Sequence, residues 1–282
     1  MTMAVATATD FGSRLRWWRT TRRYSQLELG SLAEISTRHL SFLETGRSKP
    51  SREMVVHLGA ALELPLRDTN ALLNAAGFAP AFTEFDLDEP VMTGVRSVLT
   101  TILNAHLPNP AVVVDRLGDL VDANGAAIQL MAVAVAPDSD AMLPTPNLNR
   151  LTFHPDGIKI RTGNWADVAS SLLLRLERER NHRPADADLA DLVDEMLGYP
   201  GVAELRSGPR QFSGADLIVP LVIDLDDAEN GNEGRQTGGT LSLLTTISTI
   251  GSPHDVTLDE LRLETFFPTD DRSRAILETW SA

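Results

Sequence analysis

Three consecutive polar side chains, Thr37, Arg38 and His39, are of types that can recognise the edges of DNA bases. An arginine can donate two parallel hydrogen bonds to O6 and N7 of guanine, and a threonine hydroxyl can pair with several base edges. Such contacts need an element narrow enough to enter the major groove, and an α-helix meets that requirement. These residues therefore predict a short helix with an exposed amino end.

A basic loop follows within ten residues. Arg47, Lys49 and Arg52 carry charges that suit phosphate oxygens, and phosphate contacts make affinity depend steeply on salt. The same three residues could instead form an ordinary solvated charge cluster on the surface.

The elements that must position these groups are five helices joined by tight turns in residues 1–80. Apolar residues at helical spacing predict a first helix over residues 11–22. Ser25 with Glu28 three positions later forms a capping box, which starts a second helix at Gln26. Ser36 caps a third helix over residues 37–44, which Gly46 ends. Ser51 caps a fourth helix, and a fifth runs from residue 65 to residue 77.

Two short helices separated by a tight turn, the second with polar residues at its amino end, have the geometry of a helix-turn-helix. A helical bundle that binds nothing has the same topology. The segments 25–29 (SQLEL) and 35–47 (ISTRHLSFLETGR) resemble the lambdoid-repressor, Cro-type (XRE) signature over residues 11–77. Gly30 and Glu34 depart from it, at positions where alanine and glycine are usual.

The resemblance implies roles for further residues. It makes Gln26 a clamp on a phosphate and places Thr37, Arg38 and Phe42 where the family reads bases, with Ser36 and His39 next to them. Phe42 can contact a thymine methyl group. Glu44, at the end of the same helix, is expected to form a structural ion pair or hydrogen bond.

Length and charge divide the chain in two. At 282 residues it is long enough for two domains. Residues 1–80 hold ten Lys and Arg against seven Asp and Glu, whereas the remainder holds 15 against 32. A basic head that can touch DNA is thus joined to an acidic body that DNA would repel. The prediction is a helical DNA-binding domain over residues 1–80, a linker over 81–91, and a second domain over 92–282.

Composition excludes several functional classes. Without cysteine there are no disulfides, thiolate metal sites or cysteine nucleophiles. Motifs for phosphate-binding loops, serine hydrolases and zinc peptidases are absent, and the six scattered histidines suggest no metal site. We expect no enzymatic activity, cofactor or metal. With no leader-like or membrane-spanning stretch, a soluble, cytoplasmic protein without a membrane partner is expected.

The second domain mixes helices and strands. The pattern predicts a helix over residues 91–106, a strand over 111–115, a turn and a second short strand. Asn124 then caps a helix. Helices follow over 165–181 and 188–198, then strands over 217–225, 240–250 and 261–267, with a mobile hairpin tip over 226–239 and a closing helix. The opening resembles a PAS-like α+β domain with an antiparallel sheet, so the chain as a whole is a multidomain combination of an all-α head and an α/β body.

Four further segments carry a second resemblance. They are residues 147–155 (NLNRLTFHP), the pair 164–165 (NW), 199–201 (YPG) and 251–268 (GSPHDVTLDELRLETFFP). They look like the MmyB-like ligand-binding domain that is attached to Cro-type regulators, over about residues 92–278. That resemblance implies a pocket for a small lipophilic ligand, with fatty-acid-like molecules as the leading class. The residue before Asn124 is alanine, where an aromatic residue is usual, so one wall of the pocket is expected to be roomier.

Candidate ligand-binding residues follow from polarity, because pockets combine apolar walls with a few polar groups. Arg175 or His154 could meet an anionic head. Alternatively, the apolar residues are plain core, His154 is a turn histidine, and Arg175 pairs with Glu179 on the surface. The candidate walls are Phe153, Trp165, Leu172, Leu176, Leu243 and Phe266.

Together these patterns predict a homodimeric, ligand-responsive regulator that binds a pseudo-palindromic site on double-stranded DNA. In the alternative reading, the second domain only dimerises or contacts another protein. A filled core in place of a cavity would favour that alternative.

Overall fold

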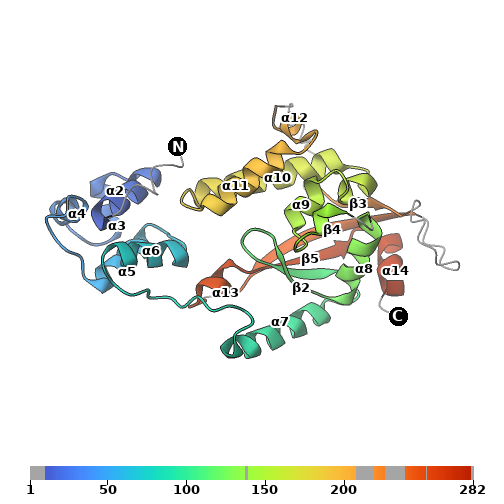
Figure 1. Ribbon diagram of the computed structural model, residues 1–282, viewed down its shortest axis with the longest axis horizontal. Coiled ribbons are helices and arrows are strands. Elements are labelled where there is room, and N and C mark those ends of the chain that lie inside the picture. Colours follow the sequence, from blue (N-terminus) through green and yellow to red (C-terminus); the bar gives the residue numbers. More distant parts are fainter. Residues whose placement is uncertain (1–9, 137–138, 208–218, 226–238, 252, 281–282) are drawn as a thin grey trace. The chain divides into compact units, whose positions relative to one another are not determined.

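The computed structural model describes residues 10–136, 139–207, 219–225, 239–251 and 253–280 (Figure 1). Its described residues separate into two compact units. The first comprises residues up to Asp86 together with the short segments Arg183–Ala187 and Gly251–Asp259. The second comprises the rest of the chain.

The first unit contains the five expected helices around one apolar core. They are α2 (Phe11–Thr21), α3 (Gln26–Leu32), α4 (Thr37–Glu44), α5 (Arg52–Ala61) and α6 (Leu66–Ala75). The capping box of Ser25 and Glu28 is present, and the hydroxyl of Ser51 accepts a hydrogen bond from the Met54 N–H. Leu15, Leu29, Leu40 and Leu58 are completely buried in the core. The predicted all-helical head is therefore confirmed.

Each of these helices ends in a residue with left-handed backbone. Glu34, in the turn between α3 and α4, has φ 51°, and the next residue, Ile35, donates its N–H to the carbonyl of Gly30 at 2.8 Å. Gly46 plays the same part after α4, with φ 69°. A left-handed conformation is unfavourable for a residue with a Cβ, so the turn holds Glu34 in a strained state.

Hydrogen bonds to side chains hold the segment that follows α6, residues 81–85. Asn70 accepts hydrogen bonds from the N–H groups of Ala81 and Phe82 and donates to the carbonyl of Phe82. Further along, the N–H of Phe85 donates to Asp255, and the hydroxyl of Thr257 donates to the carbonyl of Phe85. Residues 81–85 thus form an ordered strap.

The second unit combines one sheet with covering helices. In chain order, its longer elements are α7 (Thr93–Ala105), β1 (Ala111–Val114), β2 (Leu120–Ala123), α8 (Gly125–Ala134), α9 (Leu148–Phe153), α10 (Trp165–His182), α11 (Ala187–Gly198), α12 (Val202–Ser207), β3 (Leu221–Asp224), β4 (Thr240–Thr249), β5 (Arg262–Pro268) and α14 (Asp271–Trp280). Short 3-10 turns lie at Pro90–Met92, Asp140–Met142 and Ile158–Arg161. The short helix α13 (Val256–Glu260), which precedes β5 in the chain, belongs to the first unit except for its last residue.

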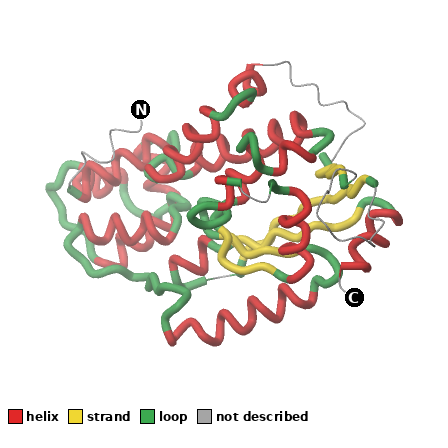
Figure 2. Tube along the Cα trace, turned by 45° about the vertical axis from the view of Figure 1, so that its right-hand side comes forward, coloured by secondary structure: helices red, strands yellow, loops and turns green. Residues whose placement is uncertain are grey.

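The sheet is antiparallel throughout, in the order β2-β1-β5-β4-β3. Figure 2 shows its strands as one curved layer. Across β4 and β5, Thr245 pairs with Phe266 and Ile247 with Glu264, so these four side chains share a face. The predicted α+β domain with an antiparallel sheet is confirmed.

Asn124 caps α8 as predicted and does more. Its side-chain oxygen accepts hydrogen bonds from the N–H groups of Ala127 and Ala111, and its amide donates to the carbonyls of Leu103 and Asn109. One buried side chain therefore joins α7, β1 and α8.

Several elements differ from expectation. The periodic patterns did not predict α9, α12 and α13, each of six residues or fewer. A strand was predicted over residues 217–225, and within the described residues β3 covers only Leu221–Asp224. The predicted hairpin tip over 226–239 lies, except for Gly239, outside the described residues.

Candidate nucleic-acid interface and ligand pocket

Helix α4 presents a largely polar surface because its two leucines point into the core. Leu40 and Leu43 are fully buried, whereas Thr37 and Arg38 are exposed. The hydroxyl of Ser36 accepts a hydrogen bond from the N–H of His39 at 3.1 Å. Ser36 therefore fixes the first turn of the helix, the turn that carries the candidate base-reading side chains.

On this surface, two arginine side chains lie against the ring of Phe42. The guanidinium carbon of Arg38 lies 5.3 Å from the centre of the Phe42 ring, and that of Arg47 lies 5.8 Å from it. Both distances are within the range of cation–π attraction. A contact with the aromatic face pre-orients each arginine and leaves its N–H edge to donate.

A buried ion pair joins α2 to the end of α4, and a hydrogen bond from Gln26 adds the start of α3. Glu44 accepts hydrogen bonds from Arg19 Nε at 2.6 Å and from the Arg19 terminal nitrogen at 3.1 Å. Gln26 Nε2 donates to the same carboxylate at 2.7 Å. The structural role expected of Glu44 is confirmed. Gln26 is thus held in place through one of the two hydrogens of its amide.

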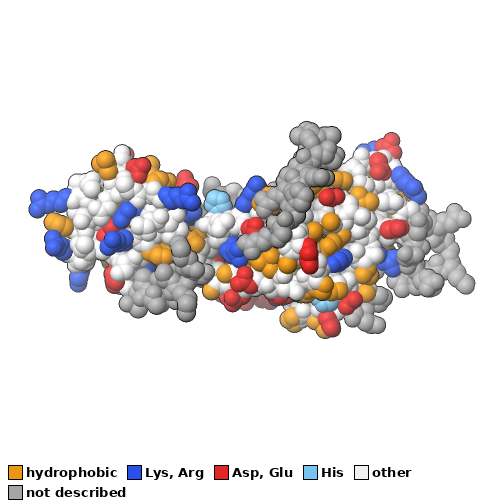
Figure 3. All heavy atoms as spheres, turned by 90° about the horizontal axis from the view of Figure 1, so that it is seen from above, with side chains coloured by type: hydrophobic (Ala, Val, Ile, Leu, Met, Phe, Trp, Pro, Cys, Tyr) orange, Lys and Arg blue, Asp and Glu red, His pale blue; other side chains and the backbone are white. Residues whose placement is uncertain are grey.

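The basic loop residues differ in how they are held. Lys49 is exposed, whereas Arg52 donates one hydrogen bond to the carbonyl of Pro80 at 3.2 Å. In Figure 3, blue Lys and Arg side chains project from the first unit, at the left of the view. Arg52 is thus partly engaged in holding the end of its own unit, while Arg47 and Lys49 face solvent.

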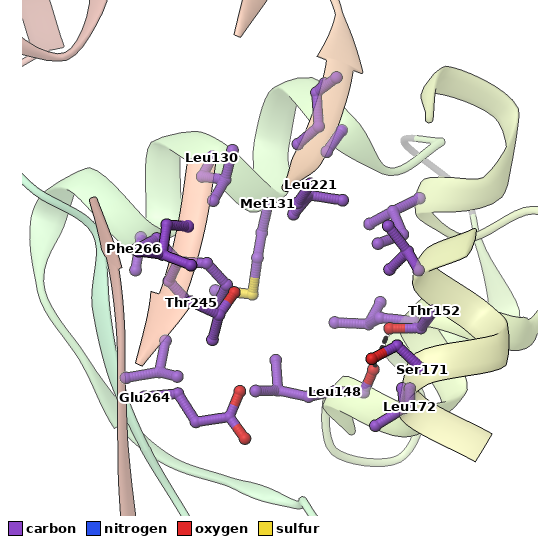
Figure 4. A pocket seen from close by; sticks show the side chains of 18 of the residues that line it. Leu130, Met131, Leu148, Thr152, Ser171, Leu172, Leu221, Thr245, Glu264 and Phe266 are labelled. Carbon is purple, nitrogen blue, oxygen red and sulfur yellow. Dashed lines mark hydrogen bonds between the residues drawn. The ribbon is translucent and has the colours of Figure 1, made fainter. Parts of the chain in front are cut away.

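The second unit contains a cavity of about 490 Å³ between the sheet and helices α8, α9 and α10 (Figure 4). Its walls are mostly aliphatic. The polar side chains that reach it are Thr152, Ser171, Arg175, Thr245 and Glu264. The apolar ones include Leu130, Met131, Leu148, Leu172, Leu221 and Phe266.

Three of the eight predicted ligand-binding residues line this cavity: Leu172, Arg175 and Phe266. Phe153 and Leu176 instead pack in a dry core with α11, and Leu243 packs in a second core beside the cavity. These three are fully or almost fully buried, as the alternative reading as core residues expected.

The other two predicted residues lie near the cavity without lining it. The indole N–H of Trp165 donates to the carbonyl of Thr152 at 2.8 Å, and Lys159 lies over its ring at 3.7 Å. His154 Nδ1 accepts the N–H of Asp156, and its ring meets Tyr199 edge-on. This is the turn histidine of the alternative reading. Burial and a hydrogen bond to Glu195 raise the pKa of Tyr199 to about 12.

The geometry of α10 explains why Leu176 does not line this cavity. Each step of four residues turns a helix by about 40° beyond a full circle. The series Val168, Leu172, Leu176 therefore drifts away from the cavity, whereas Arg175 stays in line with Val168 and Leu172. Ala169, Leu173 and Leu176 form a second apolar face that packs on α11. Both faces of α10 are apolar, and periodicity does not tell a cavity wall from core.

Glu264 was missed among the pocket residues. It lies two positions before Phe266 on β5, so the two side chains share a face of the sheet. The two-residue spacing from Phe266 was the signal in the sequence that could have placed Glu264 at the pocket. Glu264 is only 7% exposed and accepts a hydrogen bond from Arg175 at 3.1 Å. Burial raises the pKa of the Glu264 carboxyl, and the charge of Arg175 opposes this rise.

Two further searches cover the described residues only. Within them, no cluster of three or more His, Asp or Glu side chains could hold a metal ion. None of the helices described is both long and apolar enough to cross a bilayer.

Comparisons with known proteins agree with both sites. Residues 10–72 match the family model of a helix-turn-helix domain, and residues 95–214 match that of the MmyB-like transcription regulator ligand binding domain. No curated protein matches the chain significantly. Among solved structures, an RNA-binding light-oxygen-voltage receptor is 13% identical with a TM-score of 0.26, over 99% of this chain and 64% of that chain. The chain thus spans under two thirds of that receptor, and at this TM-score the likeness carries no argument.

The two family matches lie in the order that the sequence patterns predicted. The first includes α4, and the second includes the part of the cavity lining that comes from residues before 214. The chain joins a helix-turn-helix domain to an MmyB-like transcription regulator ligand binding domain.

Proposed function

We propose that this regulator binds a specific DNA sequence as a homodimer and responds to a small lipophilic effector with a fatty-acid-like chain. The exposed first turn of α4 supports the DNA reading, because it presents Thr37, Arg38 and His39 beside the two cations on Phe42. One helix of this length reads only a few base pairs. Two copies on half-sites about 34 Å apart supply the remaining specificity.

The cavity is the single observation that carries the effector reading. Taking about 30 Å³ per non-hydrogen atom, the share of one water molecule in the liquid, its 490 Å³ accommodates on the order of 15 such atoms. That is the size of a medium-length fatty chain with its head. A domain that only dimerised would gain stability from filling this space.

Effector binding regulates by selecting among conformations. If the effector binds one arrangement of the dimer more tightly than another, it shifts operator affinity by its difference in affinity for the two. Couplings of this kind are typically about 1–3 kcal/mol, which corresponds to roughly 5-fold to 150-fold in affinity. The sign of regulation depends on which arrangement fits the operator.

Base reading by Arg38 is tested on operators selected from random DNA. Arg38→Ala is expected to weaken binding by about 1–3 kcal/mol and to relax selection at one base position, whereas Arg38→Lys keeps the charge but loses the two-pronged contact. Arg47→Ala should weaken all sequences equally and lower the salt slope by about one. Equal binding of all sequences by the wild type would overturn the proposal.

The effector reading is tested by native mass spectrometry of the full chain, before and after denaturing extraction. We expect a co-purified lipophilic molecule that is released on unfolding. Ala134→Trp, which fills the cavity from α8, should lose it. An adduct that stays with this variant would place the molecule elsewhere, and a wild type that binds no fatty-chain probe would remove the effector.

A further inference from the structure

The polar end of the cavity has an unusual feature: a buried carboxylate that faces inward. Glu264 is 7% exposed, and Figure 4 shows its carboxylate pointing from β5 into the pocket. Its Oε1 accepts a hydrogen bond from Arg175 at 3.1 Å. Among the residues that the structure describes, none donates a hydrogen bond to its Oε2.

Glu264 Oε2 is not among the fully buried polar atoms without a partner, so it is open to the cavity. A ligand that filled the cavity would exclude water from this oxygen, and a carboxylate oxygen that loses water without gaining a donor is unfavourable. The neighbouring cavity walls offer only the hydroxyls of Thr152, Ser171 and Thr245, and the Thr152 hydroxyl donates to the carbonyl of Leu148. A hydrogen-bond donor on the ligand would satisfy Oε2 directly.

Charge at this end of the cavity disfavours an anion. Arg175 is the only cationic side chain among the described lining residues, and Glu264 already engages it. Glu179, one turn further along α10, adds a second negative charge that acts on Glu264. An anionic head that took Arg175 from Glu264 would leave a buried carboxylate unpaired, and breaking such a pair is strongly unfavourable.

We propose that Glu264 selects the head group of the effector, so that the pocket prefers a fatty chain ending in an uncharged hydrogen-bond donor, such as an alcohol, to the matched carboxylate. This inference rests on the proposed function, and it refines the head while keeping the chain. It replaces the expectation that Arg175 meets an anionic head.

Three probes of equal chain length separate the components of this preference. Decan-1-ol offers a donor, methyl decanoate is neutral but offers only acceptors, and decanoate is ionised at pH 7.5. Each is titrated into the full-length protein by calorimetry. We expect decan-1-ol to bind roughly tenfold or more tightly than decanoate, and several-fold more tightly than methyl decanoate.

Two matched variants assign the preference to one side chain. Glu264→Gln keeps the shape and an acceptor for Arg175 but removes the charge, so the gap between decan-1-ol and decanoate should shrink to about threefold or less. Thr246→Val removes a hydroxyl at the next position on β4, outside the cavity lining, without changing charge, and it should leave the gap intact. Circular dichroism and DNA binding confirm that both variants fold.

The outcomes distinguish this inference from the proposed function. Decanoate binding as tightly as decan-1-ol overturns the head-group preference but leaves the lipophilic effector standing. Methyl decanoate binding as tightly as decan-1-ol overturns the need for a donor. A gap that survives in Glu264→Gln removes Glu264 from the account. If none of the three probes binds the wild type, the effector function itself fails, and the inference fails with it.

Discussion

Each unit of this regulator contains a buried Arg–Glu pair, and the two pairs are built differently. In the DNA-binding unit, Glu44 accepts three hydrogen bonds, two from Arg19 and one from Gln26. In the ligand-binding unit, Glu264 accepts one, from Arg175, whose side chain is 35% exposed.

The number of hydrogen bonds that each carboxylate accepts indicates whether a buried charge stabilises the fold or is available to bind another molecule. A carboxylate with both oxygens engaged, as in Glu44, fixes the geometry around it, because a displacement breaks hydrogen bonds. A carboxylate with one oxygen unengaged keeps its capacity to bind for another molecule. The first pair holds α4 in place, and the second leaves one carboxylate oxygen without a donor at the cavity.

The largest expected effect on stability is at the pair of Arg19 and Glu44. Glu44→Gln removes the charge while Arg19 stays buried, and this should lower the free energy of unfolding of the first unit by about 3–5 kcal/mol. Because the chain has two units, hydrogen exchange of α2 and α4 peptides is the appropriate measurement. A loss below about 1 kcal/mol would show that the pair behaves like a surface pair and would break the comparison.

Packing density offers a second contrast between the units. A Cβ on Gly12 would lie 2.7 Å from the carbonyl oxygens of Leu43 and Glu44, so Gly12→Ala must push α2 away from α4 and should destabilise by about 1–3 kcal/mol. Gly94 in α7 has nothing within 4 Å of such a Cβ. Gly94→Ala should therefore stabilise by about 0.5–1 kcal/mol. Exchange protection of α4 and α7 measures both, and effects of equal sign would contradict the packing argument.

The turn of the helix-turn-helix should respond to a smaller change. Glu34 has φ 51°, which glycine adopts without strain. Glu34→Gly relieves a left-handed conformation but adds freedom to the unfolded chain, so the net gain in unfolding free energy should be about 0.5–1 kcal/mol. Glu34→Ala, which keeps the strain, is the control. Equal stability of the two variants would argue against strain at this turn.

The smallest expected effect on stability is at the pair of Arg175 and Glu264, and it depends on pH. Because burial raises the pKa of Glu264 above its ordinary value of 4.5, folding favours the protonated carboxyl. This contribution to stability is fully present below the unfolded pKa and is lost as pH rises through the folded one. Wild type should therefore lose stability relative to Glu264→Gln between pH 4 and pH 8, as measured by the exchange of β5 peptides. A relative gain would contradict the raised pKa.

The helical head was predictable because local interactions determine it. Ser25, Ser36 and Ser51 cap helices through hydrogen bonds to residues three positions later, so the signals lie within one turn of chain. The helix α4 begins and ends where those signals place it, at Thr37 and Glu44.

The pocket was less predictable because distant segments decide it. Whether a leucine of α10 faces the cavity or α11 depends on which neighbour covers it, and both faces look alike in sequence. The partner of Arg175 lies 89 residues further along the chain, whereas the sequence pattern offered Glu179. The fold class followed from the pattern, but the polar end of the site did not.

The strap over residues 81–85 has a consequence for synthesis of the protein. Phe85 donates a hydrogen bond to Asp255 and accepts one from Thr257, 170 and 172 residues downstream. At about 5–20 residues per second, the ribosome needs on the order of ten seconds or more to deliver these partners. The nascent helices can form at once, but the DNA-binding unit is completed only after most of the effector pocket has been translated.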